Sequence, residues 1–205
     1  MVMTPETIAT ALSELAARDA DIARAVEAVG YPEPRNREQG FGTFLNIIIG
    51  QQVSVHAAAA IRGRLVEATQ PLTPDSFLAL DDDALRVVGL SRRKMEYSRL
   101  LAEDILSGAF SPDKLPELDD DQVMAEIIAR KGLGRWSAEV YMLFALGRTD
   151  VWPADDLAVQ VAVQRIKGLD ERPNRATMDE IAEAWRPWRG IAALLFWHHY
   201  NTAAL

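Results

Sequence analysis

The 205-residue chain contains no cysteine and only three histidines. The lack of cysteine excludes disulfide bonds, thiolate zinc sites and iron–sulfur clusters, and so few histidines give no reason to expect a metal centre. The chain also lacks an apolar run of the about 20 residues that a membrane helix needs. Its first residues, MVMTPETIATALSEL, lack the basic segment and apolar core of a signal peptide. We therefore expect a cytoplasmic monomer with no membrane partner.

Acidic residues are missing from two long stretches of a chain that is acidic overall. The net charge is −8 and the pI about 4.9, which alone argues against nucleic acid, because a polyanion prefers a basic partner. However, no acid occurs from position 41 to 66 or after Glu183, and bases gather at Arg92, Arg93 and Lys94. Two interpretations stay open: a basic face that meets a polyanion, or charges on solvated helix faces.

The alternation of apolar and polar residues that marks a half-buried strand is also missing. Apolar residues recur at helical spacing instead, in about a dozen segments. The apolar segment Phe41–Ile49 could be a strand, but we favour a buried helix because an alanine-rich run, Ala57–Ala60, soon follows it. The predicted fold is all-α: one domain over 1–205 with a groove between two helical lobes. The lobes are expected at about 41–150 and at 1–40 plus 151–205.

Short polar motifs predict where several helices begin. Thr4 stands before a proline, the arrangement of an N-cap followed by proline at the first helical position. A helix is expected over Val53–Ala68. Thr177 and Glu180 have the spacing of a capping box, and Pro187 is expected to start the last helix.

The segment Lys131–Lys167 contains a glycine-rich turn, Gly132-Leu133-Gly134, between two predicted helices, 119–130 and 136–146. Glycine permits the positive φ of a tight reversal, and a turn without side chains lets a phosphate reach the backbone N–H groups. Three basic residues flank this turn: Arg130, Lys131 and Arg135. The pattern predicts a phosphate-binding helix-hairpin-helix, although an ordinary helix connection would also use glycine.

Two adjacent acids, Asp155 and Asp156, open the next predicted helix. One of them is explained by N-capping, and a second is more than capping requires. A carboxylate at a helix N-terminus is stabilised by the helix dipole, which suits a group that must stabilise positive charge. Two capping acids remain the alternative interpretation.

Aromatic and amide side chains suggest further binding residues. All five tryptophans lie in the second half of the chain, among them Trp136 and Trp197. Most should be core residues, but a pocket of such rings could stack on a planar cationic ligand. Gln51 and Gln52 interrupt two apolar helices, where buried amides need partners. They could lie in an exposed turn or probe a duplex, and His56 one turn later could reach a phosphate.

Together these segments resemble the helix-hairpin-helix DNA glycosylase superfamily. The resemblance rests on the glycine hairpin with Trp136 behind it, PADDLAVQ beyond it, GQQVSVHAAAAI upstream and WRPWRGIAALLFW near the end. It runs in one unbroken order from about Phe41 to Tyr200. Within the superfamily the chain is similar to the compact form of the alkylpurine branch, to which bacterial 3-methyladenine DNA glycosylase II belongs.

The resemblance implies a role for each matched residue. The catalytic aspartate falls on Asp156, which leaves Asp155 to the turn or the helix start. The wedge that replaces an extruded nucleotide falls on Gln52, with Gln51 beside it, and aromatic positions of the base pocket fall on Trp136 and Trp197. The hairpin, from Gly132 through Leu133 and Gly134 to Arg135, would bind DNA. In some members its carbonyls also hold a monovalent cation.

The implied activity is that of a monofunctional glycosylase. Such an enzyme flips alkylated purines of the 3-methyladenine type out of double-stranded DNA and hydrolyses the N-glycosidic bond in base excision repair. Strand-cutting branches carry a lysine where Trp136 stands, and its amine would form a Schiff base. Val140 stands where the larger bacterial enzyme has a pocket tyrosine. The alternatives are the same fold acting on deaminated or mismatched bases, or a non-catalytic DNA-binding scaffold.

Overall fold

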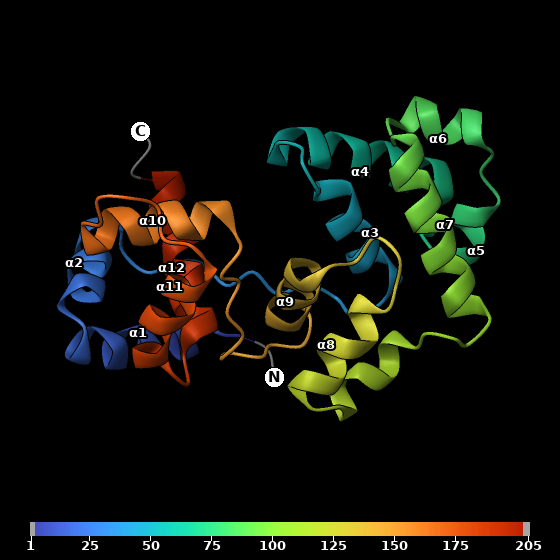
Figure 1. The fold of residues 1–205 in the computed structure, drawn as a ribbon. Coiled ribbons are helices and arrows are strands. Elements are labelled where there is room, and N and C mark those ends of the chain that lie inside the picture. Colours follow the sequence, from blue (N-terminus) through green and yellow to red (C-terminus); the bar gives the residue numbers. More distant parts are fainter. Residues whose placement is uncertain (1–2, 203–205) are drawn as a thin grey trace. The chain divides into compact units, whose positions relative to one another are not determined.

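The computed structural model describes residues 3–202, and no strand occurs among them (Figure 1). The prediction of an all-α fold is therefore confirmed for this part of the chain. The elements are α1 (Pro5–Arg18), α2 (Ala20–Val29), α3 (Phe41–Gly50), α4 (Val55–Thr69), α5 (Pro74–Leu78), α6 (Asp82–Val88), α7 (Arg92–Leu106), η1 (Pro112–Glu117), α8 (Asp120–Ile128), α9 (Arg135–Phe144), α10 (Leu157–Lys167), α11 (Arg175–Ala182), η2 (Glu183–Trp185) and α12 (Arg189–Thr202).

The helices form two compact units. The continuous unit is Arg37–Leu146 and holds α3 to α9. The discontinuous unit combines the described residues up to Asn36 with those from Gly147 onward, that is, α1 and α2 with α10 to α12. No helix among residues 3–202 combines the length and the apolar character that crossing a bilayer requires.

Helix α3 is the centre of the continuous unit and packs against α4, α7 and α9. Its apolar side chains are buried on all sides, which explains why the segment shows no amphipathic pattern and confirms the helix expected at Phe41–Ile49. Phe44 stacks on Tyr141 of α9 with ring centres 3.8 Å apart. The Tyr141 hydroxyl accepts the Gly40 N–H at 3.0 Å, and burial raises the pKa of Tyr141 to about 12.

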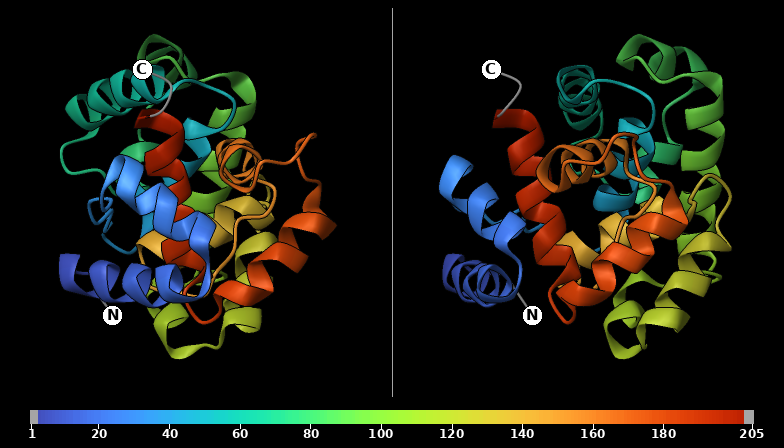
Figure 2. Two further views of the ribbon diagram at one scale, coloured as in Figure 1. Left: turned by 90° about the vertical axis from the view of Figure 1, so that its left-hand side faces the viewer. Right: turned by 60° about the vertical axis from the view of Figure 1, so that its left-hand side comes forward.

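Helix α12 has the same position in the discontinuous unit, where it packs against α1, α2 and α10 (Figure 2). Eight consecutive residues of α12, from Gly190 to Trp197, are buried. Trp152, Trp185 and Phe196 form an aromatic cluster with ring centres 5.0–6.1 Å apart. Two of the tryptophans are therefore core residues, as the sequence suggested for most of them.

Asp19 joins the early and late segments of the discontinuous unit. Its carboxylate accepts N–H groups at the start of α2 and binds the Lys167 ammonium at 2.7 Å and the Trp185 indole at 2.8 Å. Burial alone would raise the pKa of Asp19, but the hydrogen bonds from Lys167 and Trp185 outweigh it and hold the pKa below its ordinary value of 3.8. Ionised Asp19 therefore stabilises the folded state.

This contact predicts acid sensitivity. Because the pKa of Asp19 is lower in the folded than in the unfolded state, its contribution is complete above about pH 5 and is lost as the pH falls through the folded-state pKa. We expect Asp19→Asn to lower the free energy of unfolding at pH 7, and the difference from wild type to shrink toward pH 3. Urea unfolding across this pH range measures it. A difference that stays constant with pH would show that Asp19 contributes only through packing and capping.

Three predicted helix boundaries differ from the structure, while Thr4 caps α1 as expected. Helix α4 starts at Val55, two residues late, because the Ser54 side chain accepts the Ala57 N–H. Helix α11 starts at Arg175 with Asn174 as its cap, so the capping box at Thr177 is wrong. Helix α12 starts at Arg189 instead of Pro187.

Candidate functional site

The glycine hairpin of the continuous unit joins α8 to α9. Gly132 has φ +89°, and a Cβ there would lie 2.3 Å from a ring carbon of Tyr97. This position therefore needs glycine both for its backbone conformation and for the close approach of Tyr97. Leu133 is buried and anchors the turn in the core. Gly134 has an extended φ of −100°, so the expectation of a positive φ is correct for Gly132 and wrong for Gly134.

Helix α9 begins without a capping side chain. Its N-cap is Gly134, and no side chain accepts a hydrogen bond at this end. Most other helices of the chain start at a serine, threonine, aspartate or asparagine that caps them. The first N–H groups of a helix have no intrahelical partner and bind anions readily. The start of α9 thus keeps its N–H groups for a ligand, and a Cβ on Gly134 would meet nothing within 4 Å.

The basic residues that flank the hairpin are neutralised by acids. Arg130 binds Asp104 at 3.1 Å, Lys131 binds Glu96 at 2.6 Å, and Arg135 binds the buried Glu139 at 3.0 Å. The positive charge that the sequence places around the turn is therefore already paired. An anion at this turn would depend on the backbone N–H groups of α9 and on cations from elsewhere.

Gln51 and Gln52 follow α3 and have different environments. The Gln51 amide donates to the Gly132 carbonyl at 2.9 Å, so it braces the hairpin across 81 residues of sequence. Gln52 is exposed and has a positive φ of 56°, which is rare for a residue with a side chain. The break after α3 thus supplies one amide that holds the hairpin and one that points to solvent.

The two glutamines should respond differently to truncation. We expect Gln51→Ala to lower the free energy of unfolding by about 1 kcal/mol, because it removes a hydrogen bond from a partly buried carbonyl. Gln52→Ala should leave stability within about 0.5 kcal/mol and weaken action on damaged DNA. Chemical unfolding and base-release assays on the two variants measure both effects. Equal loss of stability would contradict this division.

Three residues at the hairpin were not assigned from the sequence: Tyr97, Arg93 and Lys94. Tyr97 packs on Gly132, the Arg93 guanidinium lies 5.9 Å from the centre of the Tyr97 ring, and Lys94 donates to the Ile49 carbonyl at 2.7 Å. The only sequence signals were the basic cluster itself and the similarity of Gly89-Leu90-Ser91 to Gly132-Leu133-Gly134.

Asp156, in the discontinuous unit, is the N-cap of α10. Its Oδ1 accepts the Ala158 N–H at 2.9 Å, the Val159 N–H at 3.1 Å and the Trp197 indole N–H at 3.0 Å. Asp155 is exposed and pairs with Arg175. The assignment of the helix start to Asp155 is therefore wrong: Asp156 caps the helix itself. Three donors to one oxygen hold the carboxylate in a single orientation.

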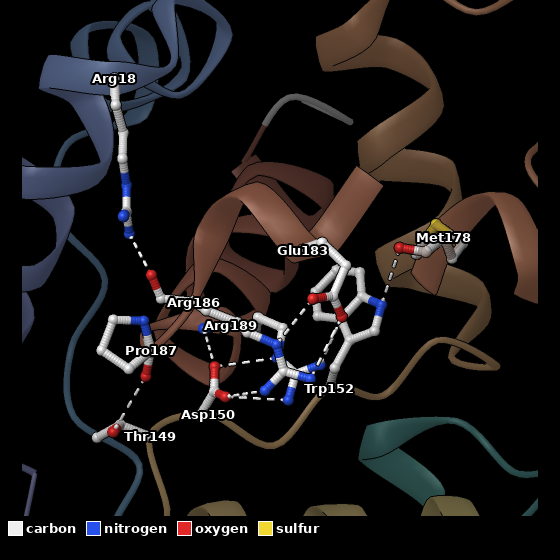
Figure 3. A network of polar contacts seen from close by, with 9 residues as sticks. All are labelled: Arg18, Thr149, Asp150, Trp152, Met178, Glu183, Arg186, Pro187 and Arg189. Carbon is white, nitrogen blue, oxygen red and sulfur yellow. Dashed lines mark hydrogen bonds and ion pairs between the residues drawn. The ribbon is translucent and has the colours of Figure 1, made fainter. Parts of the chain in front are cut away.

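A second carboxylate joins the segment before Asp156 to the start of α12. Asp150 binds Arg189 through two nitrogens at 2.9 and 3.0 Å and Arg186 at 2.7 Å, as Figure 3 shows. The Thr149 carbonyl accepts the Gly190 N–H at 2.8 Å, and the Trp152 indole donates to the Met178 carbonyl (Figure 3). This network fixes both ends of the segment that places Asp156 opposite Trp197.

The two tryptophans expected in a base pocket lie in different units. Trp197 is buried on α12 and touches Asp156, whereas Trp136 is half-buried in the first turn of α9, next to the hairpin. Val140 is buried on α9, and His56 is exposed on α4. The structure thus joins Asp156 with Trp197 in one unit, and Gln51 with Gly132 in the other.

Known proteins share this arrangement. DNA-3-methyladenine glycosylase 1 of Schizosaccharomyces pombe is 28% identical over 94% of this chain and 89% of its own length. DNA-3-methyladenine glycosylase 2 of Escherichia coli is 30% identical over 78% of this chain. The matched part is 56% of the E. coli protein, so this chain spans little more than half the length of that relative.

A solved structure supports the same grouping. Schizosaccharomyces pombe 3-methyladenine DNA glycosylase (Mag1) in complex with abasic DNA superposes with a TM-score of 0.86 and 28% identity, covering 96% of this chain and 97% of that one. The family model described as HhH-GPD superfamily base excision DNA repair protein matches residues 45–187. The chain belongs to the HhH-GPD superfamily of base excision DNA repair proteins.

Proposed function

We propose that this chain is a monofunctional DNA glycosylase that hydrolyses the N-glycosidic bond of alkylated purines of the 3-methyladenine type. The observation that carries the proposal is the environment of Asp156, whose carboxylate is held by two helix N–H groups and the Trp197 indole. A single oriented carboxylate beside an aromatic ring suits a reaction that builds positive charge on a sugar. The names of the relatives support the substrate class.

Asp156 would stabilise the transition state electrostatically. When the bond from the sugar to the base breaks, the sugar acquires oxocarbenium character, and a fixed negative charge beside it lowers the barrier. The same carboxylate can orient the attacking water. Because its hydrogen bonds are formed before the reaction, no reorganisation of the carboxylate is needed at the moment of bond cleavage.

The departing base needs little help from an acid. An alkylated purine already carries positive charge and leaves as a neutral base. Aromatic faces attract such a cation, which gives Trp136 and Trp197 a role in binding the flipped base. Trp136 has no amine that could form a Schiff base with the sugar, so the proposal includes the absence of strand cleavage.

The hairpin would hold a phosphate of the DNA backbone. The uncapped N–H groups at the start of α9 are the donors, and the missing Gly134 side chain leaves room for the phosphate. The turn also offers a carbonyl, that of Leu133, which accepts no hydrogen bond from residues 3–202. This carbonyl fits the proposed monovalent cation, while the Gly132 carbonyl is already used by Gln51.

Release of free base from methylated duplex DNA tests the proposal. The DNA is incubated with the protein, released bases are separated, and abasic sites are then revealed by alkali. We expect 3-methyladenine release, with strand breaks only after alkali. Breaks without alkali would contradict monofunctional action. Release from deaminated or mismatched DNA alone would change the substrate class, and DNA binding without any release would indicate a scaffold.

A further inference from the structure

A cleft of about 340 Å³ lies beside the hairpin, entirely within the continuous unit. Three segments form it: the break after α3, the first turns of α7 and the hairpin. Its lining residues are Gln51, Gln52, Ser91, Arg93, Lys94, Tyr97 and Gly132. The lining contains two cations and no acid, although the chain has a net charge of −8. The cleft is therefore suited to an anionic ligand.

The two cations of the cleft differ from those of the hairpin because they are not neutralised. Among residues 3–202, neither Arg93 nor Lys94 forms an ion pair. The Lys94 ammonium is half-buried and donates only to the neutral Ile49 carbonyl at 2.7 Å, and burial lowers the pKa of Lys94. The nearest acid on the same helix, Glu96, is paired with Lys131 at 2.6 Å.

The turn that leads into the cleft repeats the geometry of the hairpin. Gly89 has φ +105° and Gly132 has φ +89°, and each is followed by a leucine that is 4% exposed. A fifteen-residue helix, α7, starts after Ser91, and its first residues are the basic ones. Side-chain cations thus stand at α7 where the hairpin offers backbone N–H groups at α9.

We propose that Arg93 and Lys94, with the Ser91 hydroxyl, form a second binding site for a phosphodiester of the DNA backbone, separate from the hairpin turn. The inference rests on the proposed function in one respect: the polyanion is duplex DNA. Because the cleft also contains Gln52 and Gly132, a strand held at the hairpin passes close to it. Two points of attachment on one rigid unit fix the direction of the strand as well as its position.

The salt dependence of DNA binding tests this site. Each phosphate that a protein neutralises contributes about 0.9 to the slope of log K against log salt concentration. We expect Arg93→Gln to reduce the slope by about 0.9 and to weaken binding of damaged and undamaged duplexes by the same factor. Lys114→Gln is the matched control, because Lys114 is an exposed cation of the same unit outside the cleft.

Further variants separate binding from folding. Arg93 is exposed, so thermal melting of Arg93→Gln should match wild type. Lys94→Arg should keep the slope, whereas Lys94→Met should lower it. An unchanged slope in Arg93→Gln, or an equal drop in Lys114→Gln, would overturn the proposal. Competition by inorganic phosphate at constant ionic strength, present in wild type and absent in Arg93→Gln, would reassign the cleft to a free phosphate. The slope is measured on undamaged DNA, whereas failure of the proposed function would appear as absent base release by wild type.

Discussion

Asp156→Asn is expected to lower the rate of base release from methylated DNA by at least about a hundredfold, the usual effect of losing one preorganised electrostatic group. The substitution keeps an acceptor oxygen for the Ala158 and Val159 N–H groups and for the Trp197 indole, and asparagine is as good an N-cap as aspartate. The fold and DNA binding should therefore be preserved. Single-turnover rates, thermal melting and duplex binding measure the three properties.

Two controls separate catalysis from capping. Asp156→Ala removes the cap as well and should cost about 1 kcal/mol of stability in addition to the loss of rate. Asp155→Asn breaks the ion pair with Arg175, which is solvent-exposed, and should change neither rate nor stability much. Full activity of Asp156→Asn would reduce Asp156 to a capping residue and leave the chemistry without its carboxylate.

Gly132→Ala should destabilise the protein by about 3 kcal/mol or more. The added Cβ would lie 2.3–2.4 Å from ring carbons of Tyr97, and alanine at φ +89° is strained in any surroundings. Because Tyr97 lines the cleft, any relief of this overlap moves the cleft as well as the turn. Urea unfolding should show the loss, and DNA binding should fall with it.

Gly134→Ala is the matched comparison. Its φ is −100° and its added Cβ meets nothing within 4 Å, so stability should stay within about 0.5 kcal/mol of wild type. The new methyl group would nevertheless occupy the space that we assign to the phosphate, so DNA affinity should fall in a protein that remains folded. Normal affinity of Gly134→Ala would remove the phosphate from the start of α9.

The sequence was most informative where local chemistry determines structure. Phe41–Ile49 could be identified as a helix because neighbouring residues show no alternation, and the hairpin because two glycines stand between two helical patterns. Boundaries failed where two residues could each serve as a cap. Asn174 and Thr177 are both good capping residues, and so are Asp155 and Asp156. In each case contacts with distant parts of the chain decide between them.

Contacts across long sequence separations could not be predicted. The hydrogen bond from Gln51 to the Gly132 carbonyl and the packing of Tyr97 on Gly132 follow from how α3, α7 and the hairpin meet. The neutralisation of Arg130 and Lys131 also depends on acids of α7. Counting charges along the sequence therefore placed the positive potential at the hairpin, whereas the unpaired cations lie at Arg93 and Lys94.

The division into a continuous and a discontinuous unit has a consequence for synthesis on the ribosome. Domains fold as units, with N-terminal parts first. The unit with the hairpin and the cleft is complete once Leu146 has emerged, whereas Asp19 waits for Lys167, 148 residues later, before α1 and α2 can be fixed. A nascent chain that stops after α9 thus contains the proposed phosphate contacts but neither Asp156 nor Trp197. The order of translation provides the means of holding DNA before the means of cutting a base from it.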